Sequence, residues 1–455
     1  MKNHLYAFMV ATVVMIMSFY VSCISLPYSI VSKSEPNVLT LPSSELNGDI
    51  VIKFKDLNFE SEVRNVINKP TGDIIFNDVA QITTLDISNC DIADLSGIEY
   101  FTSLTELDCS MNRLAALDVT QNTALRVLTC WGWDNQITKL DISKNAKLEV
   151  LICSDNFLSE LDVSQNRMLM ELDCSRTGLK SLDLSQNHML KKLYCTENGL
   201  STLDFSQNPY LDNIDCSMNR LAALDVTQNT ALRILSCWDN KLTVLSVSRN
   251  KALEELVCHY NLLTTLDVSN NVALQHLDCG ANILTSLNVN QNSALIELSC
   301  YFNQLTSLDI SKNQMLEKLD CSDNYITELD VSSNFALSSL FCSYNQLVSL
   351  ELNSNPELAD LGCRDNQLTN LDVSRNPALK QLWCKNNQLQ TLDVSRNYAL
   401  EYLSCSGNQL RTLDVSQNNA LERLECQNNL FLDKSSIIGR NVDKLKRFVF
   451  EPQDR

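Results

Sequence analysis

The sequence has little positive charge and little glycine or proline, and each shortage excludes a class of protein. Its 455 residues include 36 Lys and Arg against 55 Asp and Glu, which gives a net charge of −19. That balance argues against a nucleic-acid partner, because nucleic-acid binding requires a basic face. The 10 Gly and 8 Pro exclude collagen-like and low-complexity chains. With 44% hydrophobic residues, the chain can instead bury a core.

Catalytic and cofactor-binding motifs are also lacking. The sequence has no nucleophile elbow, P-loop or dinucleotide-binding glycine motif. His259 follows a cysteine and His276 precedes the next one, which places the two toward opposite ends of neighbouring strands, a poor arrangement for a metal pair. We therefore expect no enzyme activity, no metal site and no cofactor.

Cysteine, by contrast, is abundant and regularly spaced. Sixteen of the 18 cysteines, from Cys109 to Cys426, follow one period of 21 residues, with a single interval of 23 between Cys130 and Cys153. A fixed period of this length is typical of a solenoid, whereas disulfide frameworks space their cysteines irregularly. Each of these cysteines replaces an inward-pointing aliphatic residue, so we expect a ladder of buried, unpaired and inert thiols.

Each repeat contains the same half-motif twice, as in the unit that begins at Leu316, LEKLDCSDNYITELDVSSNFA. Alternation of apolar and polar residues in both halves predicts two short extended segments per coil. Asn recurs in 15 of 16 first halves, with Thr177 as the exception, and in all 15 second halves. We expect these amides to hydrogen-bond the backbone of adjacent coils in two ladders.

An acidic residue recurs in 13 of the 15 second halves, where it should face outward. Stacked carboxylates repel one another, so some other interaction must offset the repulsion. Two explanations are open: hydrogen bonds from the Ser or Thr two residues on and from nearby backbone amides, or divalent cations bound along the row.

The repeats from residue 82 to residue 429 resemble those of the leucine-rich-repeat superfamily, and in particular the internalin J type of bacterial surface protein, whose repeats carry a cysteine ladder. The resemblance rests on the motif L-x-x-L-x-C-x-x-N-x-L and its 21-residue period. It implies a leucine-rich-repeat solenoid, a curved right-handed parallel β coil with little helix and a helical N-terminal cap. It also implies a non-catalytic, adhesin-like protein that binds a protein or glycoprotein partner through its concave face.

Aromatic residues are frequent at the variable positions of the first-half strand, immediately before and after each cysteine. Exposed aromatics suit protein contacts and sugar stacking, although they also have high strand propensity. The candidate partner-binding residues are Trp131, Trp133, Tyr194, Trp238, His259, Tyr260, Tyr301, Phe302, Phe341, Tyr344, Trp383 and Tyr402. The alternative functions are surface glycan capture and a structural coat without a specific ligand. A two-residue insertion, CWGWDN, should break the ladder locally and project Trp131 and Trp133.

The two ends of the chain depart from the repeat. Residues 1–23 resemble a bacterial lipoprotein signal with Cys23 as the lipidated residue, and the alternatives are an uncleaved anchor or a plain secretory signal. Residues 24–48 are predicted to be a tether, 49–81 an N-terminal cap with a helix over 56–68, 82–429 the solenoid and 430–455 a C-terminal cap. We expect an exported protein of the bacterial cell envelope or surface, in contact with a membrane only through this anchor.

Overall fold

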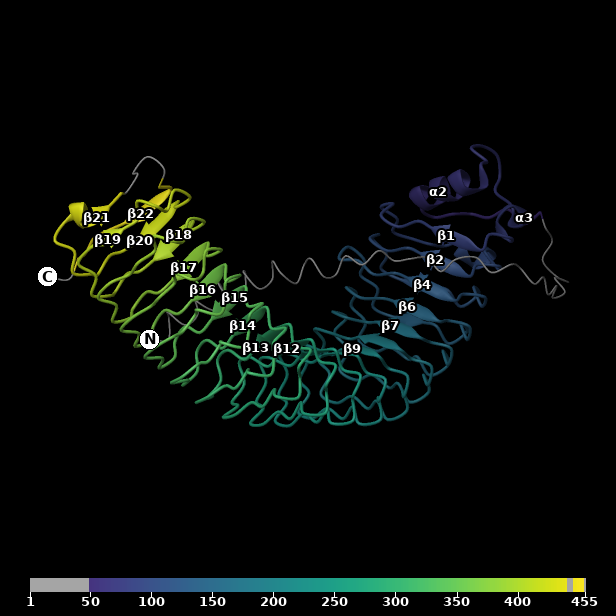
Figure 1. Ribbon diagram of the computed structural model, residues 1–455. Helices are drawn as coiled ribbons and strands as arrows, with labels where there is room; N and C mark the ends of the chain where they lie inside the picture. Colours follow the sequence, from purple (N-terminus) through teal and green to yellow (C-terminus); the bar gives the residue numbers. More distant parts are fainter. Residues whose placement is uncertain (1–48, 440–444, 454–455) are drawn as a thin grey trace. The chain divides into compact units, whose positions relative to one another are not determined.

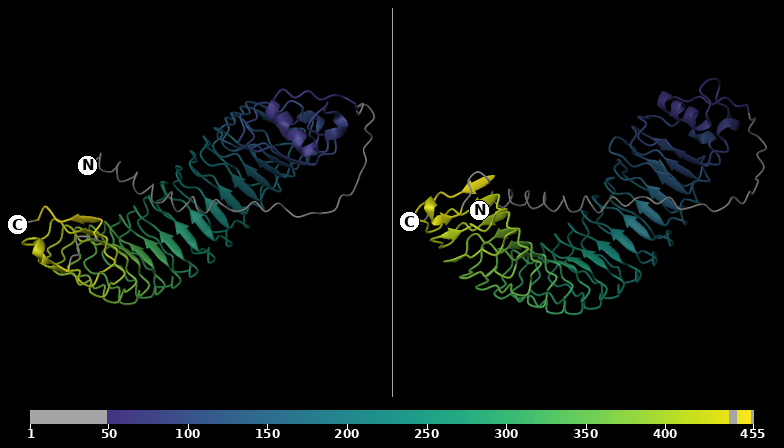
Figure 2. Two further views of the ribbon diagram at one scale, coloured as in Figure 1. Left: turned by 90° about the horizontal axis from the view of Figure 1, so that it is seen from above. Right: turned by 45° about the horizontal axis from the view of Figure 1, so that its top comes forward.

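Short parallel strands form the main sheet of the protein (Figure 1). The computed structural model describes residues 49–439 and 445–453. The sheet has 18 strands that pair in the order of the sequence, because each coil returns the chain beside the strand it has just left. Within the one compact unit that these residues form, the coils stack into an arc whose inner, concave side is lined by the sheet (Figures 1 and 2).

Every element is short. The helices are α2 (Leu57–Ile67), α3 (Phe76–Val79), and the 3-10 helices η1 (Ile98–Tyr100) and η2 (Lys434–Ser436). The main sheet contains β1 (Thr84–Asp86), β2 (Glu106–Asp108), β4 (Val127–Thr129), β6 (Val150–Ile152), β7 (Glu171–Asp173), β8 (Lys192–Tyr194), β9 (Asn213–Asp215), β10 (Ile234–Ser236), β11 (Glu255–Val257), β12 (His276–Asp278), β13 (Glu297–Ser299), β14 (Lys318–Asp320), β15 (Ser339–Phe341), β16 (Asp360–Gly362), β17 (Gln381–Trp383), β18 (Tyr402–Ser404), β20 (Arg423–Glu425) and β22 (Arg447–Val449). Two separate pairs are β3 (Leu117–Asp118) with β5 (Leu140–Asp141), and β19 (Leu413–Asp414) with β21 (Ile437–Ile438). Over the described residues, no helix has both the length and the apolar character to span a membrane.

The strand sequence sets the register of the sheet. In β14, Leu319 pairs with Leu298 of the preceding strand and with Leu340 of the following one. These leucines are buried, whereas the residues on either side of them face outward. Side chains alternate across a strand, so the leucine of each strand faces the core and its neighbours do not. The register places each leucine beside the leucine of the next repeat, and continuous rows of leucine fill the core.

The sixteen periodic cysteines lie in this core. All of them are buried, as predicted. Burial raises the pKa of these thiols, to about 12 at Cys130 for example, so the sulfurs stay protonated and unreactive near neutral pH. Cys90, which lies outside the period, is half-buried. The predicted signal sequence, the tether and Cys23 lie outside the described residues.

Buried asparagines join each coil to the preceding coil. The Nδ2 group of Asn324 donates to the Cys321 carbonyl of its own coil at 3.1 Å and to the Cys300 carbonyl of the preceding coil at 3.0 Å. Its Oδ1 atom accepts a hydrogen bond from the Leu305 N–H of the preceding coil at 3.0 Å. The same three contacts recur along the first halves, which confirms the first predicted ladder.

Asparagines of the second halves form the other ladder. The Nδ2 group of Asn334 donates to two carbonyls of the preceding coil, those of Ile310 at 3.1 Å and Asn313 at 2.8 Å. The second extended segment of each coil pairs as a strand only in β3–β5, β19–β21 and two isolated bridges of the described residues. The N–H of Ser332 bonds to Asp330 of its own coil at 2.9 Å, and the equivalent bond is present in the segments that pair as well.

That same hydrogen bond offsets the repulsion within the acidic row. At Asp183 and Asp414, the backbone N–H and the hydroxyl of the serine two residues on hold the pKa of the carboxyl below its usual range. These are the hydrogen bonds that the first of the two explanations predicts. Among the described side chains, no group of three or more His, Cys, Asp or Glu is placed to hold a metal ion.

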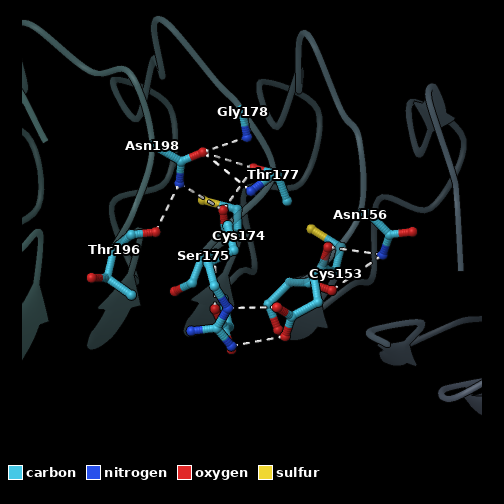
Figure 3. Close-up of polar contacts among 12 residues, drawn as sticks. Cys153, Asn156, Cys174, Ser175, Thr177, Gly178, Thr196 and Asn198 are labelled. Atoms are coloured by element: carbon cyan, nitrogen blue, oxygen red, sulfur yellow. Dashed lines mark hydrogen bonds and ion pairs between the residues drawn. The ribbon is translucent and has the colours of Figure 1, made fainter. Parts of the chain in front are cut away.

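The first ladder is interrupted at Thr177 (Figure 3). The Thr177 hydroxyl lies 2.7 Å from the Cys174 carbonyl of its own coil and 3.1 Å from Oδ1 of Asn198 in the following coil. It makes no hydrogen bond to the preceding coil. An asparagine there would bond to the carbonyl of Cys153 and the N–H of Leu158, by analogy with the other coils. Asn156 and Asn198 continue the ladder on either side of the gap.

The two-residue insertion leaves the ladder intact, so the predicted local break at that point is wrong. Oδ1 of Asn135 accepts from the Leu114 N–H at 2.9 Å, and its Nδ2 donates to the Cys130 carbonyl at 3.1 Å. The extra length is taken up at Gly132, whose φ is 149° and where a Cβ would lie 2.7 Å from the Met111 nitrogen. A bulge that only glycine allows thus absorbs the insertion ahead of the asparagine.

Helix α2 covers the N-terminal end of the core, as the sequence predicts. Asp56 caps the helix, accepting from the Phe59 N–H at 3.1 Å, and its second oxygen accepts from the Ala93 N–H of the adjoining coil at 2.7 Å. Phe59 is fully buried, and its ring lies 6.3 Å from that of Phe101 in a stacked arrangement. At the opposite end, β22 pairs with β20, so the sheet continues beyond the last asparagine.

Completing the ladder should stabilise the solenoid. We expect Thr177→Asn to raise the free energy of unfolding by about 1 kcal/mol, because it gives the buried Leu158 N–H an acceptor and adds a second hydrogen bond to the Cys153 carbonyl, which Asn156 already contacts. The opposite change in a complete coil, Asn324→Thr, should lower it by about 2 kcal/mol by leaving the buried Leu305 N–H without its acceptor. Guanidinium unfolding measures both. Two variants as stable as the parent would contradict the role given to the ladder.

Candidate partner-binding face

The concave face carries the side chains that flank each cysteine. Strand residues next to the buried leucine point to the inner side of the arc, and the two residues after the cysteine continue this surface. Successive coils place equivalent positions in register, as for Phe341, Gly362 and Trp383 in β15, β16 and β17 (Figure 1). A residue's neighbours on this face are therefore the residues about 21 positions away.

Three aromatic residues form a cluster near the C-terminal end of the face. The rings of Phe341 and Trp383 are 6.0 Å apart although a whole coil separates them, and Tyr402 meets Trp383 edge-on at 5.6 Å. Gly362 makes this approach possible, because a Cβ there would lie 2.6 Å from the Phe341 ring. The three rings span four successive coils and lie next to one another. They form an apolar patch, which is less common on a protein surface than single exposed side chains.

A second aromatic cluster lies nearer the middle of the array. Trp238 stacks on His259 at 5.1 Å, and Tyr260 meets His259 edge-on at 5.3 Å. Nδ1 of His259 lies 3.0 Å from the Asp278 carboxylate. Tyr301 extends the cluster by two coils, and its ring lies where any Cβ on the intervening Gly280 would overlap it.

Three bulky aromatics occupy strained backbone positions on the same face. The residue two after the cysteine has a positive φ, and at Tyr260, Phe302 and Tyr344 these angles are 52°, 51° and 55°. The left-handed region costs such residues about 1 kcal/mol relative to glycine or asparagine. The coil imposes this angle, because Met111, Glu197, Met218 and Ala281 adopt it at the same repeat position. The Arg364 guanidinium lies 4.8 Å from the Tyr344 ring and holds it in place.

An acidic coil separates the two aromatic clusters. Asp320 and Asp323 belong to the coil that lies between the coil of Tyr301 and the coil of Phe341. Both side chains are only partly exposed. Burial raises the pKa of both carboxyls to about 6, although the N–H and hydroxyl of Ser322 stabilise the Asp320 anion. Each charge is therefore held in a poorly solvated place between apolar walls.

The two histidines face different carboxylates. His276 lies 3.7 Å from Glu297, which raises the pKa of the imidazole, while Lys318 contacts the same carboxylate at 2.5 Å. His276 and Lys318 together lower the pKa of Glu297 to about 2. His259 faces Asp278 instead.

The insertion exposes an aromatic ring nearer the N-terminus. Trp133 is 69% exposed, and the Arg176 guanidinium lies 5.2 Å from its ring, two coils further on. Asp155, between them, holds Arg176 through a pair of hydrogen bonds of 2.5 and 2.8 Å. Trp131, expected to project as well, is half-buried.

The predicted site residues therefore fall into groups. The two clusters and the strained row account for nine of the twelve: Trp238, His259, Tyr260, Tyr301, Phe302, Phe341, Tyr344, Trp383 and Tyr402. Trp131 and Trp133 lie at the insertion, and Tyr194 stands apart with an Asn213 amide 3.2 Å from its hydroxyl.

Sequence reasoning missed the residues that support these aromatics. Gly280 and Gly362 allow the rings to meet, Arg176 and Arg364 hold two of them, and Asp320 lies between the clusters. A signal was present for the glycines, because each lies 21 residues before or after an aromatic at the same repeat position. Arg176 offered none, because it contacts an inserted residue that has no place in the period.

The coil shape, the asparagine ladders and the sheet-lined concave face define a leucine-rich-repeat protein. The solved functional domain of InlJ from Listeria monocytogenes, which includes a cysteine ladder, matches with a TM-score of 0.77 at 36% identity, over 81% of this chain and 84% of that one. The chain belongs to the internalin family of leucine-rich-repeat proteins. Domains of this type bind protein partners and are generally not catalytic.

Two other similar proteins are a longer internalin, matched over a small part of its length, and a more distant protein that shares the fold. The curated internalin J of L. monocytogenes serotype 4b is 38% identical over 94 residues, which are 20% of this chain and only 10% of that longer protein. A leucine-rich-repeat protein of Leptospira interrogans shares the fold, with a TM-score of 0.67 and 23% identity over 82% of this chain and 97% of that one. No protein-family model matches the chain.

Neutralising Asp320 should stabilise the protein at neutral pH but not in acid. A carboxyl whose folded pKa is about 6 binds its proton more tightly than in the unfolded chain, where the pKa is about 3.9. Stability is therefore lost as the pH rises from about 4 to about 6. We expect Asp320→Asn to exceed the parent by about 1 kcal/mol at pH 7.5 and to match it at pH 4 in denaturant unfolding.

The matched control is Asp330→Asn, on the other side of the same coil. Hydrogen bonds from Ser332 lower the pKa of the Asp330 carboxyl, so this variant should be less stable than the parent at pH 7.5, and the difference should shrink below pH 4. The same sign of effect for both variants would contradict the assignment.

Proposed function

We propose that the protein is a non-catalytic adhesin-like protein that binds a protein or glycoprotein partner through the aromatic clusters of its concave face. The observation that carries this proposal is the alignment of Trp238, His259 and Tyr260 with Phe341, Trp383 and Tyr402 along one side of the sheet. Tryptophan and tyrosine dominate the binding energy of protein interfaces, and held rings lose little entropy on binding.

The strained aromatic row adds support. Asp365 and Asn386 occupy the equivalent position in other coils at lower cost, whereas Tyr260, Phe302 and Tyr344 place aromatic rings there. Aromatic rings at this position of the concave face support a role in partner recognition. The insertion at Trp133 provides a separate, smaller contact point.

Surface glycan capture is the alternative that one observation favours. Flat, exposed aromatic rings such as Trp133, backed by an arginine, are suited to stacking on a sugar ring. A structural coat without a specific ligand is the remaining alternative. In that case the aromatic residues are present only because they favour strand formation.

Export is part of the proposal. The apolar segment that ends at Cys23 supports secretion with lipidation of that residue, at the cell envelope or surface of a bacterium. A fully buried thiol ladder is compatible with an oxidising exterior, because thiols that oxidants do not reach remain reduced.

The experiment measures binding of the purified protein to arrays of extracellular proteins and of glycans. Trp238→Ala and Trp383→Ala should each weaken the dominant protein interaction at least tenfold, which corresponds to about 1.4 kcal/mol or more. Phe335→Ala and Tyr398→Ala remove aromatics that are 59% and 61% exposed but lie away from the strands, and they should change affinity less than twofold.

The outcomes separate the three functions. Protein binding that survives both tryptophan changes would refute the concave-face site. Binding confined to glycans, and lost in Trp383→Ala, would favour glycan capture. No binding on either array by correctly folded protein, checked by thermal unfolding, would favour a structural coat.

A further inference from the structure

We propose that an exposed apolar band along one rim of the concave face binds a basic amphipathic helix of the partner polypeptide. The band lies in the five successive coils that contain β11 to β15, where the chain leaves the sheet after each cysteine. We call it the rim band, and it consists of Tyr260, Leu262, Ile283, Phe302, Tyr325 and Tyr344. The inference rests on the proposed function and deepens it by naming the shape and the charge of the segment that is recognised.

The rim band is exposed and continuous. Its residues occupy the second and the fourth position after the cysteine, and each of the five coils contributes at least one of them. All except Tyr260 are between 37% and 53% exposed, although the Arg364 guanidinium lies over the Tyr344 ring at the C-terminal end. Large apolar side chains in successive coils form a patch, and such a patch indicates a contact surface more strongly than single exposed residues do.

Hydrogen bonds between coils hold the band in register. The Tyr325 N–H donates to the Leu305 carbonyl of the preceding coil at 2.8 Å, and the Phe302 N–H donates to the Ser322 carbonyl of the following coil at 2.9 Å. Both positions of the band therefore lie on backbone that the stacking of the coils fixes. Binding to such a surface requires little ordering of the protein.

Polar coils bound the rim band at both ends. At the two positions of the band, the preceding coil carries Asp239 and Lys241, and the following coil carries Asp365 and Gln367. The apolar surface is therefore five coils long. At the spacing of neighbouring strands, about 4.8 Å, its first and last coils lie about 19 Å apart.

The spacing of the coils favours a helical occupant. One turn of an α-helix rises 5.4 Å, so a helix laid across the coils would place one apolar residue on each of them. The coils lie further apart at the rim than in the sheet, because the sheet lines the inner side of the arc (Figure 1). Side chains on one face of an extended strand repeat about every 6.7 Å, which matches the coils less well. A helix of about 14 residues spans the band.

The charge of the same coils favours a basic occupant. Residues 253–357 contain 13 Asp and Glu against two Lys and no Arg, a net charge of −11 in a chain whose total is −19. Asp323 lies between Phe302 and Tyr344 in their row, and the exposed Glu328 follows in the same coil. Lys and Arg on the polar face of a helix would complement this charge. A second copy of this chain or an anionic membrane would bring like charge to it instead.

A peptide titration tests the inference. The probe is a fluorescein-labelled peptide of about 14 residues, made only of Leu and Lys, with the leucines on one face of its helix. One comparison peptide has the same residues in an order that leaves no apolar face, and another has Glu in place of each Lys. At about 150 mM salt, we expect the full-length protein to bind the probe and to bind each comparison peptide at least tenfold more weakly.

The test variant combines Leu262→Ser, Ile283→Ser and Tyr325→Ser. These residues belong to neither aromatic cluster, and their side chains are exposed, so the fold should be retained, which thermal unfolding checks. The variant should bind the probe at least tenfold more weakly than the wild type does, because it removes the central apolar contacts of the band.

The matched control combines Met168→Ser, Met189→Ser and Tyr210→Ser. These are three apolar residues of successive coils, between 42% and 56% exposed, that lie before the strands rather than after them. The control should change the affinity for the probe less than twofold. Equal weakening by the two triple variants would overturn the inference, because it would show unspecific hydrophobic attraction.

Three further results would also overturn the inference. The first is failure of the wild type to bind the probe, and the second is equal binding of either comparison peptide. The third is that the test variant abolishes self-association of the wild type or its binding to vesicles of phosphatidylcholine and phosphatidylserine, which would assign the band to a second copy or to a membrane. The array measurement with Trp238→Ala and Trp383→Ala uses other residues and other ligands, so the proposed function is judged separately.

Discussion

The fold depends on hydrogen bonds between buried asparagine side chains and the backbone of the preceding coil. A coil of about 21 residues has sharp bends, and the carbonyls and N–H groups at those bends are shielded from water. Asn324 pairs two carbonyls and one N–H, and Asn334 pairs two more carbonyls. No coil can do this alone, because each needs the next, and solenoid stability is correspondingly a sum of nearest-neighbour terms.

Because the ladders fix the coils so tightly, the outward positions of the strands are free to vary. The core accepts only leucine and similar side chains beside the cysteines, as at Leu319. The face tolerates phenylalanine, glycine or tryptophan at one repeat position, as in Phe341, Gly362 and Trp383. The rigid backbone then turns sequence variation into defined side-chain clusters, and a glycine in one coil allows rings in its neighbours to meet.

Much of the fold could be predicted from the sequence, because the period reports the stacking directly. The buried thiols, the asparagine ladders and the helix at 56–68 follow from residue type and spacing. The tolerance of the insertion could not be predicted, because it depends on a φ of 149° at Gly132 that no pattern reveals. The sequence identifies the aromatic residues of the candidate site but not how they group. Their contacts across a coil, and the raised pKa of Asp320, depend on three-dimensional packing.

The central claim is that the coils stack without gaps and seal their interior from solvent. A measurement of thiol reactivity with a bulky aromatic disulfide reagent tests it most directly. The account predicts that the sixteen thiols from Cys109 to Cys426 stay unreacted in the native protein and all react once guanidinium unfolds it. Rapid reaction of most of them under native conditions would contradict the closed stack, and with it the ordered face on which recognition is proposed.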